Sequence, residues 1–193
     1  LDTRRLPVYN PSQLNPKLVD EEIRKITKNH KIASFNLVNQ DGESVTEKDF
    51  DGKIYVADFF FTTCQSICPK MSTQMQRLNE EYKADEDIML LSHTVYPEID
   101  SVSVLKAYAE QYAAVSGKWI LATGAKKQIY DLARKSYFAV TTKGDGGDDD
   151  FIHTENFILV DREKRIRGFY DGTNPGEIDQ LINDIAILKR EYQ

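Results

Sequence analysis

Apolar residues are nearly continuous along residues 53–61, which read Lys-Ile-Tyr-Val-Ala-Asp-Phe-Phe-Phe. A run rich in aromatic and β-branched residues predicts a strand that is buried on both faces, in a sheet covered by helices. Farther along, apolar residues recur at spacings of three and four and predict one face of a helix that ends just after Tyr82. These residues are Met71, Met75, Leu78 and Tyr82, and we expect both methionines to pack in the core.

Strand and helix patterns alternate through the rest of the chain, which implies a mainly parallel sheet flanked by helices. Two short apolar runs near the end enclose a charged turn and predict a second hairpin. A closing segment has the spacing of an amphipathic helix. The expected strands are 88–95, 119–122, 157–160 and 166–170, and the expected helices are 102–112, 126–137 and 178–188.

The N-terminal part of the chain has a different pattern. Residues 1–18 carry three of the six prolines and show no periodicity, which predicts an extended leader. We expect a short helix before residue 30. The alternating run from residue 32 to residue 45 is interrupted by Asn-Gln-Asp-Gly, as in a β-hairpin. The chain therefore divides into a leader, 1–29, and one domain, 30–193.

Composition and charge exclude several classes of protein. The chain has 193 residues, 40% of them hydrophobic, which is enough for a core, and its net charge of -6 is spread without a basic face, so we expect no nucleic-acid partner. No run approaches the roughly 18 apolar residues of a membrane helix. Because the chain starts at Leu1, we expect that an upstream signal or anchor has been removed and that membrane contact occurs only through it.

Two cysteines lie four residues apart in Thr-Thr-Cys64-Gln-Ser-Ile-Cys68-Pro, between the predicted central strand and the next helix. At that spacing, in a helical or turn conformation, their β-carbons lie about 5–6 Å apart on one face, so both sulfurs can reach one metal ion. The helix end also favours thiolate, the form that ligates metals and attacks disulfides. Two thiolates with an imidazole suit copper(I), whereas structural zinc usually has four protein ligands. The two cysteines could therefore either bind a metal ion or take part in thiol-disulfide exchange.

Other polar residues near the predicted sheet carry weaker signals. His93 lies in the predicted strand 88–95 and could approach the carboxyl end of the sheet, and His30 is a weaker candidate. Asp58 lies in an apolar strand, so we expect it to pair with a cation or to belong to a redox site. The acidic loop 144–150 lacks the spacing of an EF-hand, and we interpret it as a solvated loop.

Two separated motifs resemble the Sco/SenC copper proteins: Phe-Phe-Phe-Thr-Thr-Cys64-Gln-Ser-Ile-Cys68-Pro and, some 85 residues later, Phe-Ile-His153-Thr-Glu-Asn-Phe-Ile-Leu-Val-Asp. The resemblance implies a thioredoxin-like fold in which Cys64, Cys68 and His153 are copper ligands. It also implies assembly of the binuclear copper centre of cytochrome c oxidase. The implied partner is the copper-bearing subunit of the oxidase or another copper chaperone. Such proteins are usually tethered to the extracytoplasmic face of a membrane, here a bacterial inner membrane facing the periplasm.

One position departs from that family pattern, because Tyr96 stands where its members usually carry Asp, near the metal loop. Two functions remain open. A metallochaperone would hold copper on the reduced cysteines and His153 and would catalyse no reaction. An extracytoplasmic thiol-disulfide oxidoreductase would attack a copper protein's disulfide with Cys64, resolve the product with Cys68 and not need His153. Three residues between the cysteines, where thioredoxin-type reductants have two, favour metal, and a sensor would use the same residues.

Overall fold

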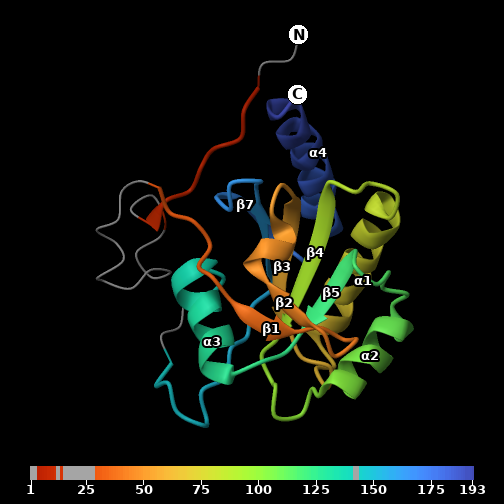
Figure 1. The fold of residues 1–193 in the computed structure, drawn as a ribbon, viewed down its shortest axis with the longest axis vertical. Coiled ribbons are helices and arrows are strands. Elements are labelled where there is room, and N and C mark those ends of the chain that lie inside the picture. The colour runs from red at the N-terminus through yellow and green to blue at the C-terminus, as the bar shows by residue number, and fades with distance from the viewer. Residues whose placement is uncertain (1–3, 12–13, 15–28, 141–143) are drawn as a thin grey trace.

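The structure is a computed structural model that describes residues 4–11, 14, 29–140 and 144–193. Most of the predicted leader, including the region of its expected short helix, lies outside the described residues. None of the described helices is both long and apolar enough to span a membrane. Figure 1 shows a central sheet with helices on both sides, and the described N-terminal segment starts at the same end of the molecule as the C-terminus.

A five-stranded sheet forms the centre of the fold, in the order β5-β4-β3-β6-β7. Strands β3, β4 and β5 are mutually parallel, and β6 alone runs in the opposite direction, since it pairs antiparallel with both β3 and β7. The mainly parallel sheet predicted from the alternating pattern is therefore confirmed, as is the second hairpin. The strands are β3 (Ile54–Phe60), β4 (Ile88–Thr94), β5 (Trp119–Ala122), β6 (Asn156–Val160) and β7 (Ile166–Asp171).

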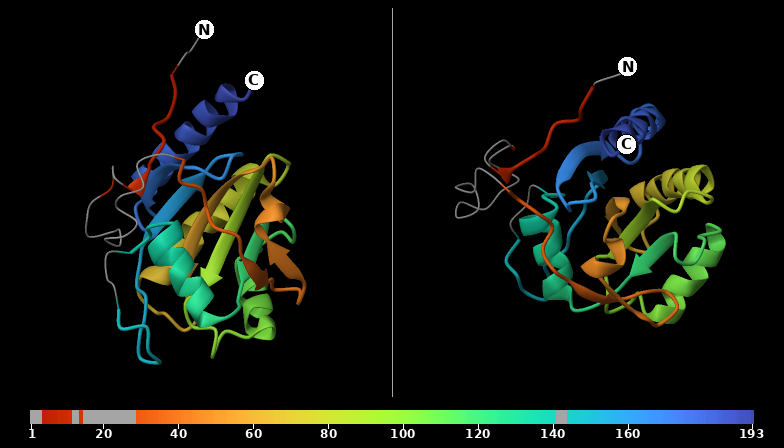
Figure 2. Two further views of the ribbon diagram at one scale, coloured as in Figure 1. Left: turned by 60° about the vertical axis from the view of Figure 1, so that its left-hand side comes forward. Right: turned by 45° about the horizontal axis from the view of Figure 1, so that its top comes forward.

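Helices cover the two faces of this sheet unequally. Helices α1 (Ile67–Tyr82), α2 (Val102–Gln111) and α4 (Pro175–Glu191) pack on one face, where Met71 and Met75 are fully buried as predicted. Helix α3 (Lys126–Asp131) lies on the other face (Figure 2). All seven residues of β3 are buried because the strand has neighbours on both sides and helices on both faces.

The predicted helix 126–137 differs from the observed one in its second half. It is α-helical only to Asp131 and continues as a π-helical turn, η5 (Leu132–Ser136), in which the Tyr137 N–H bonds to the Leu132 carbonyl at 2.7 Å. Periodicity does not reveal such a turn, because one added residue per turn barely changes the apolar spacing. Phe138 then takes a left-handed backbone conformation with φ of 53° and ends the element.

The predicted N-terminal hairpin forms a separate small sheet of β1 (Asn36–Val38) and β2 (Ser44–Thr46). A 3-10 helix, η4 (Glu47–Phe50), follows it and leads into β3. Backbone hydrogen bonds of 2.9 Å in both directions join Val38 to Thr123, just beyond the end of β5. The hairpin therefore covers the same face as α3.

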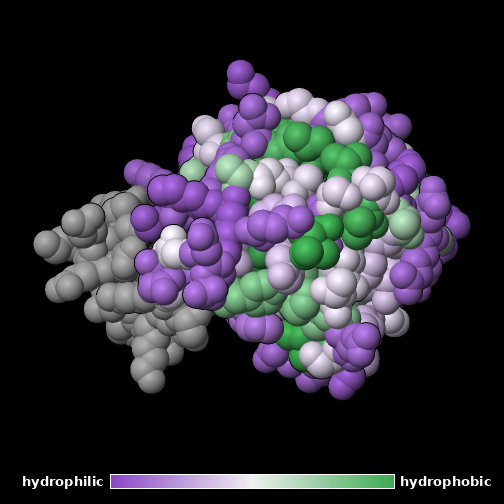
Figure 3. All heavy atoms as spheres, turned by 90° about the horizontal axis from the view of Figure 1, so that it is seen from below, coloured by the Kyte–Doolittle hydropathy of each residue, from purple (hydrophilic) through white to green (hydrophobic). Residues whose placement is uncertain are grey.

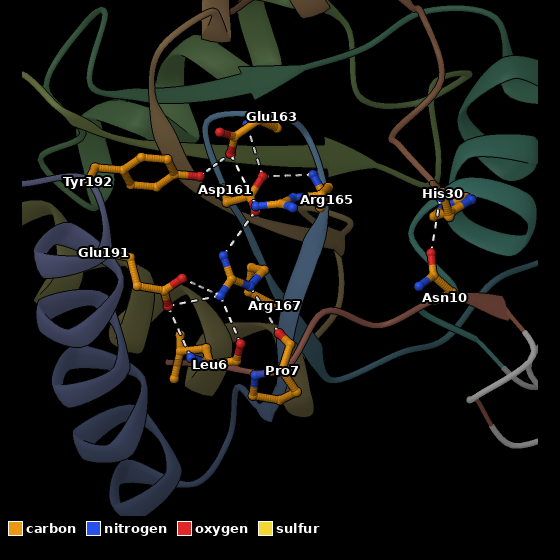
Figure 4. Close-up of polar contacts among 10 residues, drawn as sticks. All are labelled: Leu6, Pro7, Asn10, His30, Asp161, Glu163, Arg165, Arg167, Glu191 and Tyr192. Atoms are coloured by element: carbon orange, nitrogen blue, oxygen red, sulfur yellow. Dashed lines mark hydrogen bonds and ion pairs between the residues drawn. The ribbon is translucent and has the colours of Figure 1, made fainter. Parts of the chain in front are cut away.

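A buried arginine fastens the first described residues to the body of the domain (Figure 4). Arg167 on β7 donates to the carbonyl oxygens of Leu6 and Pro7 at 2.8 and 3.0 Å. It also contacts the carboxylates of Asp161 and Glu191, at 3.1 and 2.7 Å. Because both carboxylates are almost wholly buried, the network is a fixed structural joint between the leader, the second hairpin and the end of α4.

Candidate metal and thiol site

The sheet topology brings the three predicted site residues to one edge. Cys64 follows β3 by four residues, and Cys68 lies in the first turn of α1. His153 precedes β6 by three residues, and β6 runs antiparallel to β3 with Ile158 opposite Ala57. Residues before β6 therefore lie beside residues after β3, so sequence positions 85 or more apart share one end of the molecule.

The loop between β3 and α1 is held by Asp100. The Asp100 carboxylate accepts hydrogen bonds from the Thr62 N–H at 3.0 Å, from the Thr62 hydroxyl at 2.5 Å and from the Thr94 hydroxyl at 2.7 Å. Asp100 is completely buried. These bonds join the start of the cysteine loop to the end of β4 and fix the point from which the chain turns toward Cys64.

Cys64 is the more reactive of the two free thiols. Burial by itself raises the pKa of this thiol, but hydrogen bonds from the Cys68 thiol and from the backbone N–H groups of Ser66 and Cys68 outweigh it, and the pKa lies below its ordinary value. The sulfur is also 3.7 Å from the Ser66 hydroxyl. Its 9% exposure leaves it open to a partner. Of the two thiols, Cys64 is thus the one whose surroundings favour the thiolate, the nucleophilic form.

Cys68 is the buried thiol, with 2% exposure. Burial is the main reason that its pKa is raised, and the hydrogen bond to Cys64 and the negative charges of Cys64 and Asp58 raise it further. The surroundings of the two cysteines therefore shift their pKa values in opposite directions.

His153 lies near the cysteine loop but does not join the thiols. Its exposed imidazole meets the Phe61 ring edge-on, with centroids 6.0 Å apart, and the Phe151 ring at 4.9 Å. Among the described residues, no three His, Cys, Asp or Glu side chains are grouped closely enough to hold a metal ion. The structure thus brings the two cysteines together and places the predicted third ligand at the same edge, outside ligating distance.

Asp58 is a buried carboxyl on the cysteine side of the sheet. It is 2% exposed, accepts a hydrogen bond from Ser92 and leaves its Oδ1 without a partner. Burial raises its pKa to about 7. Of the two expectations for this residue, pairing with a cation is wrong among the described residues, where Ser92 is its hydrogen-bond partner, and its negative charge raises the pKa of Cys68.

The other two histidines lie away from the thiols. His93 stacks on Phe59 with ring centroids 4.4 Å apart, in the core on the opposite face of the sheet, and its Nδ1 bonds to the Asp58 carbonyl at 2.9 Å. Burial lowers the pKa of His93 to about 4. His30 bonds through Nε2 to the Ser136 carbonyl at 2.8 Å. Both are structural histidines.

Aromatic side chains cover the approach to the site. The Tyr96 ring contacts Phe151 at 5.3 Å and Phe61 at 6.4 Å between centroids, so it extends the cluster that His153 joins. Figure 3 views the molecule from this end and shows hydrophobic residues gathered within a hydrophilic rim. Where an aspartate would add charge beside the metal loop, Tyr96 adds apolar surface.

Sequence reasoning missed the residues that fix the loops around the site. Arg134 forms a nearly buried ion pair with Asp150 in the acidic loop, at 2.5 and 2.7 Å, so this loop is anchored at one end. The exposed residues 144–149 fit the predicted solvated loop. No sequence pattern links Arg134 to Asp150, because their pairing depends on the π-helical turn.

Comparisons with known proteins agree with these observations. The family model described as SCO1/SenC matches residues 23–189. A SCO1/SenC family lipoprotein from Bacillus anthracis is 30% identical with a TM-score of 0.73, covering 83% of this chain and 96% of its own. BsSco, described as a member of the Sco family of cytochrome c oxidase assembly proteins, is 33% identical with a TM-score of 0.70, covering 83% and 94%.

A third similar structure holds copper. Arabidopsis thaliana ScoI with copper bound is 28% identical with a TM-score of 0.65, and the match covers 83% of this chain and 98% of ScoI. These likenesses confirm the predicted thioredoxin-like α/β fold with an added N-terminal hairpin.

Proposed function

The chain belongs to the SCO1/SenC family, and on that premise we propose that it is a copper metallochaperone that binds one copper ion through Cys64, Cys68 and His153. Its task is assembly of the binuclear copper centre of cytochrome c oxidase. Its partner is then the copper-bearing subunit of the oxidase or another copper chaperone. The observation that carries this proposal is the pair of free cysteines at the start of α1, packed in one core cluster, with His153 at the same edge of the sheet.

The donor set fits copper as cargo. Thiolates select soft ions, and copper(I) accepts two or three ligands. Cys64 is already disposed toward thiolate, whereas Cys68 must release its proton when the metal binds. Ligation by His153 requires its imidazole to move from the Phe61 ring to the thiols. The exposed edge of Cys64 and the exposure of His153 allow a partner's ligands to replace these donors one at a time.

The second candidate function is an extracytoplasmic thiol-disulfide oxidoreductase that reduces the cysteines of a copper-protein target. The unequal pKa values of the two thiols favour it. The Cys64 thiolate would attack one sulfur of the target disulfide and release the other as a thiolate. The Cys68 thiolate would then attack Cys64, release the second target sulfur and leave a Cys64–Cys68 disulfide.

We also propose that residues 30–193 form the copper-binding domain and that residues 1–29 link it to an anchor at the extracytoplasmic face of a bacterial inner membrane. The lipoprotein among the similar structures supports this location. The described N-terminal segment lies at the end of the molecule opposite the cysteine edge (Figure 1). An anchor at that end would leave the cysteine edge facing away from the membrane.

An anaerobic titration of the reduced protein with Cu(I) against a competing chelator tests the proposal. The parent should bind one copper, and Cys64→Ser/Cys68→Ser should abolish binding. His153→Ala should weaken it by at least the roughly 10–100-fold that loss of an outer-shell partner costs. His30→Gln is the matched control and should bind like the parent. If Cu(I) binding is weak and His153→Ala does not change it, and if the protein rapidly reduces a disulfide substrate, the oxidoreductase is established instead.

A further inference from the structure

The position of His153 is set by the segment that carries it. Its ring contacts are with Phe61 and Phe151, and among the described residues it takes part in no hydrogen bond or ion pair. An exposed side chain held only by ring contacts samples several rotamers. The backbone around residue 153 must therefore decide how far the imidazole lies from the cysteines.

That segment is fastened three residues upstream, at Asp150. The side chains of Asp150 and Arg134 are 4% and 14% exposed, and their two parallel contacts of 2.5 and 2.7 Å form a bidentate ion pair. The backbone of Gly144 passes directly over it, because a Cβ there would lie 2.1 Å from Asp150 Oδ1 and 2.4 Å from Arg134 Nη2. A side chain at residue 144, whose φ of 60° favours glycine, would therefore push against the ion pair.

Arg134 is itself held in place by the fold. It lies in the π-helical turn η5, and its guanidinium carbon is 5.5 Å from the centre of the Tyr130 ring. The Tyr130 hydroxyl donates to the Val95 carbonyl at 2.7 Å, directly before Tyr96. Together, Tyr130, Arg134 and Asp150 thus join α3, the loop after β4 and the segment before β6.

The segment is fastened again on the other side of His153. The Thr154 hydroxyl and the Asn156 amide both donate to the Ala139 carbonyl, at 2.5 and 2.9 Å. His153 therefore lies on a short span between two fixed points. A span fixed at both ends leaves little backbone freedom to lose when the imidazole becomes a ligand.

We propose that Arg134 is a positioning residue for copper, which through its bidentate pair with Asp150 holds the segment from which His153 reaches the thiols. This inference rests on the proposed function, since it assigns Arg134 a role only through His153. Removing the ion pair frees the upstream end of the segment that carries His153. More conformational entropy must then be lost when His153 becomes a ligand. Arg134→Gln and Asp150→Asn should each weaken Cu(I) binding on the order of tenfold, and never by more than His153→Ala.

The test compares the parent with Arg134→Gln, Asp150→Asn, His153→Ala and Arg134→Gln/His153→Ala in one chelator-competition series. Lys135→Gln, an exposed neighbour paired with Asp131, is the matched control. If Arg134 acts through His153, Arg134→Gln weakens the parent but adds nothing in the His153→Ala background. Equal weakening in both backgrounds, or none in either, overturns the inference while the copper site stands. If His153→Ala itself changes nothing, the copper site and the inference both fail.

A readout without added metal separates positioning from general loss of structure. Amide hydrogen exchange in residues 151–155 should speed up in Arg134→Gln and not in Lys135→Gln, while exchange in β3 and β4 stays slow. Arg134→Lys keeps the charge without the bidentate geometry, so its exchange rate in residues 151–155 should lie between those of Arg134→Gln and Lys135→Gln. If β3 and β4 also exchange faster in Arg134→Gln, Asp150→Asn replaces it in the comparison. Unchanged exchange in residues 151–155 with both variants refutes the inference.

Discussion

Replacing Asp58 with asparagine should stabilise the protein at alkaline pH and leave it nearly unchanged in acid. In the folded protein burial raises the pKa of this carboxyl from its ordinary 3.8 to about 7. Between those values the folded state holds a proton that the unfolded chain has released, so the free energy of unfolding falls as the pH rises. Each pKa unit is worth about 1.4 kcal/mol, and the whole difference therefore amounts to about 4 kcal/mol.

Asparagine has the same shape and no charge, so Asp58→Asn should lack this pH-dependent loss. At about pH 8 the free energy of unfolding of the variant should exceed that of the parent by about 4 kcal/mol, and at about pH 4 the two free energies should be nearly equal. Urea unfolding can be followed by the fluorescence of Trp119, whose indole N–H donates to Ser92 at 3.0 Å, next to the carboxyl.

Asp100→Asn is the matched control, because Asp100 is equally buried but accepts three hydrogen bonds. This variant should lose about 1–3 kcal/mol at both pH values, since an amide cannot accept all three. If the difference between the parent and Asp58→Asn is the same at about pH 4 and about pH 8, Asp58 titrates as an ordinary carboxyl and the reasoning is refuted.

Two further predictions concern the thiols and the N-terminal joint. Iodoacetamide should label Cys64 at least about tenfold faster than Cys68 near pH 7, because the pKa of Cys64 is lowered and its sulfur is more exposed. Peptide mass spectrometry of the reduced protein measures both labelling rates, and equal rates would contradict this prediction. Arg167→Ala should lower the free energy of unfolding by about 3–5 kcal/mol, because it leaves buried carboxylates unpaired. Arg162→Ala, at the surface, should change it by less than about 1 kcal/mol in the same denaturation assay.

Local patterns were sufficient to predict most elements of the fold. The buried run around β3 and the helical spacing of Met71, Met75 and Leu78 depend only on which side chains face the core, and that is visible in sequence. The π-helical turn after α3 was not predictable, because it depends on how Phe138 and Ala139 fit against the rest of the fold. The Ala139 N–H bonds to the Ala133 carbonyl at 2.8 Å only once the chain has reversed there.

The closeness of the two cysteines was predictable from the sequence, whereas the arrangement of the proposed donors was not. The spacing of Cys64 and Cys68 implied that they lie close together, although Cys64 lies in the loop before α1 and only Cys68 lies in its first turn. Their opposite pKa shifts depend on burial and on Asp58, which reaches Cys68 through the tertiary structure. The sheet topology brings His153 to the same edge, but its distance from the thiols is a property of the segment between Asp150 and Thr154.

Under the proposed function, the separation of His153 from the thiols bears on how the protein would release copper. A site whose three donors already converge loses little entropy on binding and holds its ion tightly, whereas a site that must draw in one donor spends part of the binding free energy on that movement. In the proposed site the thiols would supply a fixed pair and the imidazole a reversible third ligand, so a partner could displace His153 first. The Arg134–Asp150 pair limits that movement to a short span. A donor set arranged in this way suits delivery better than storage.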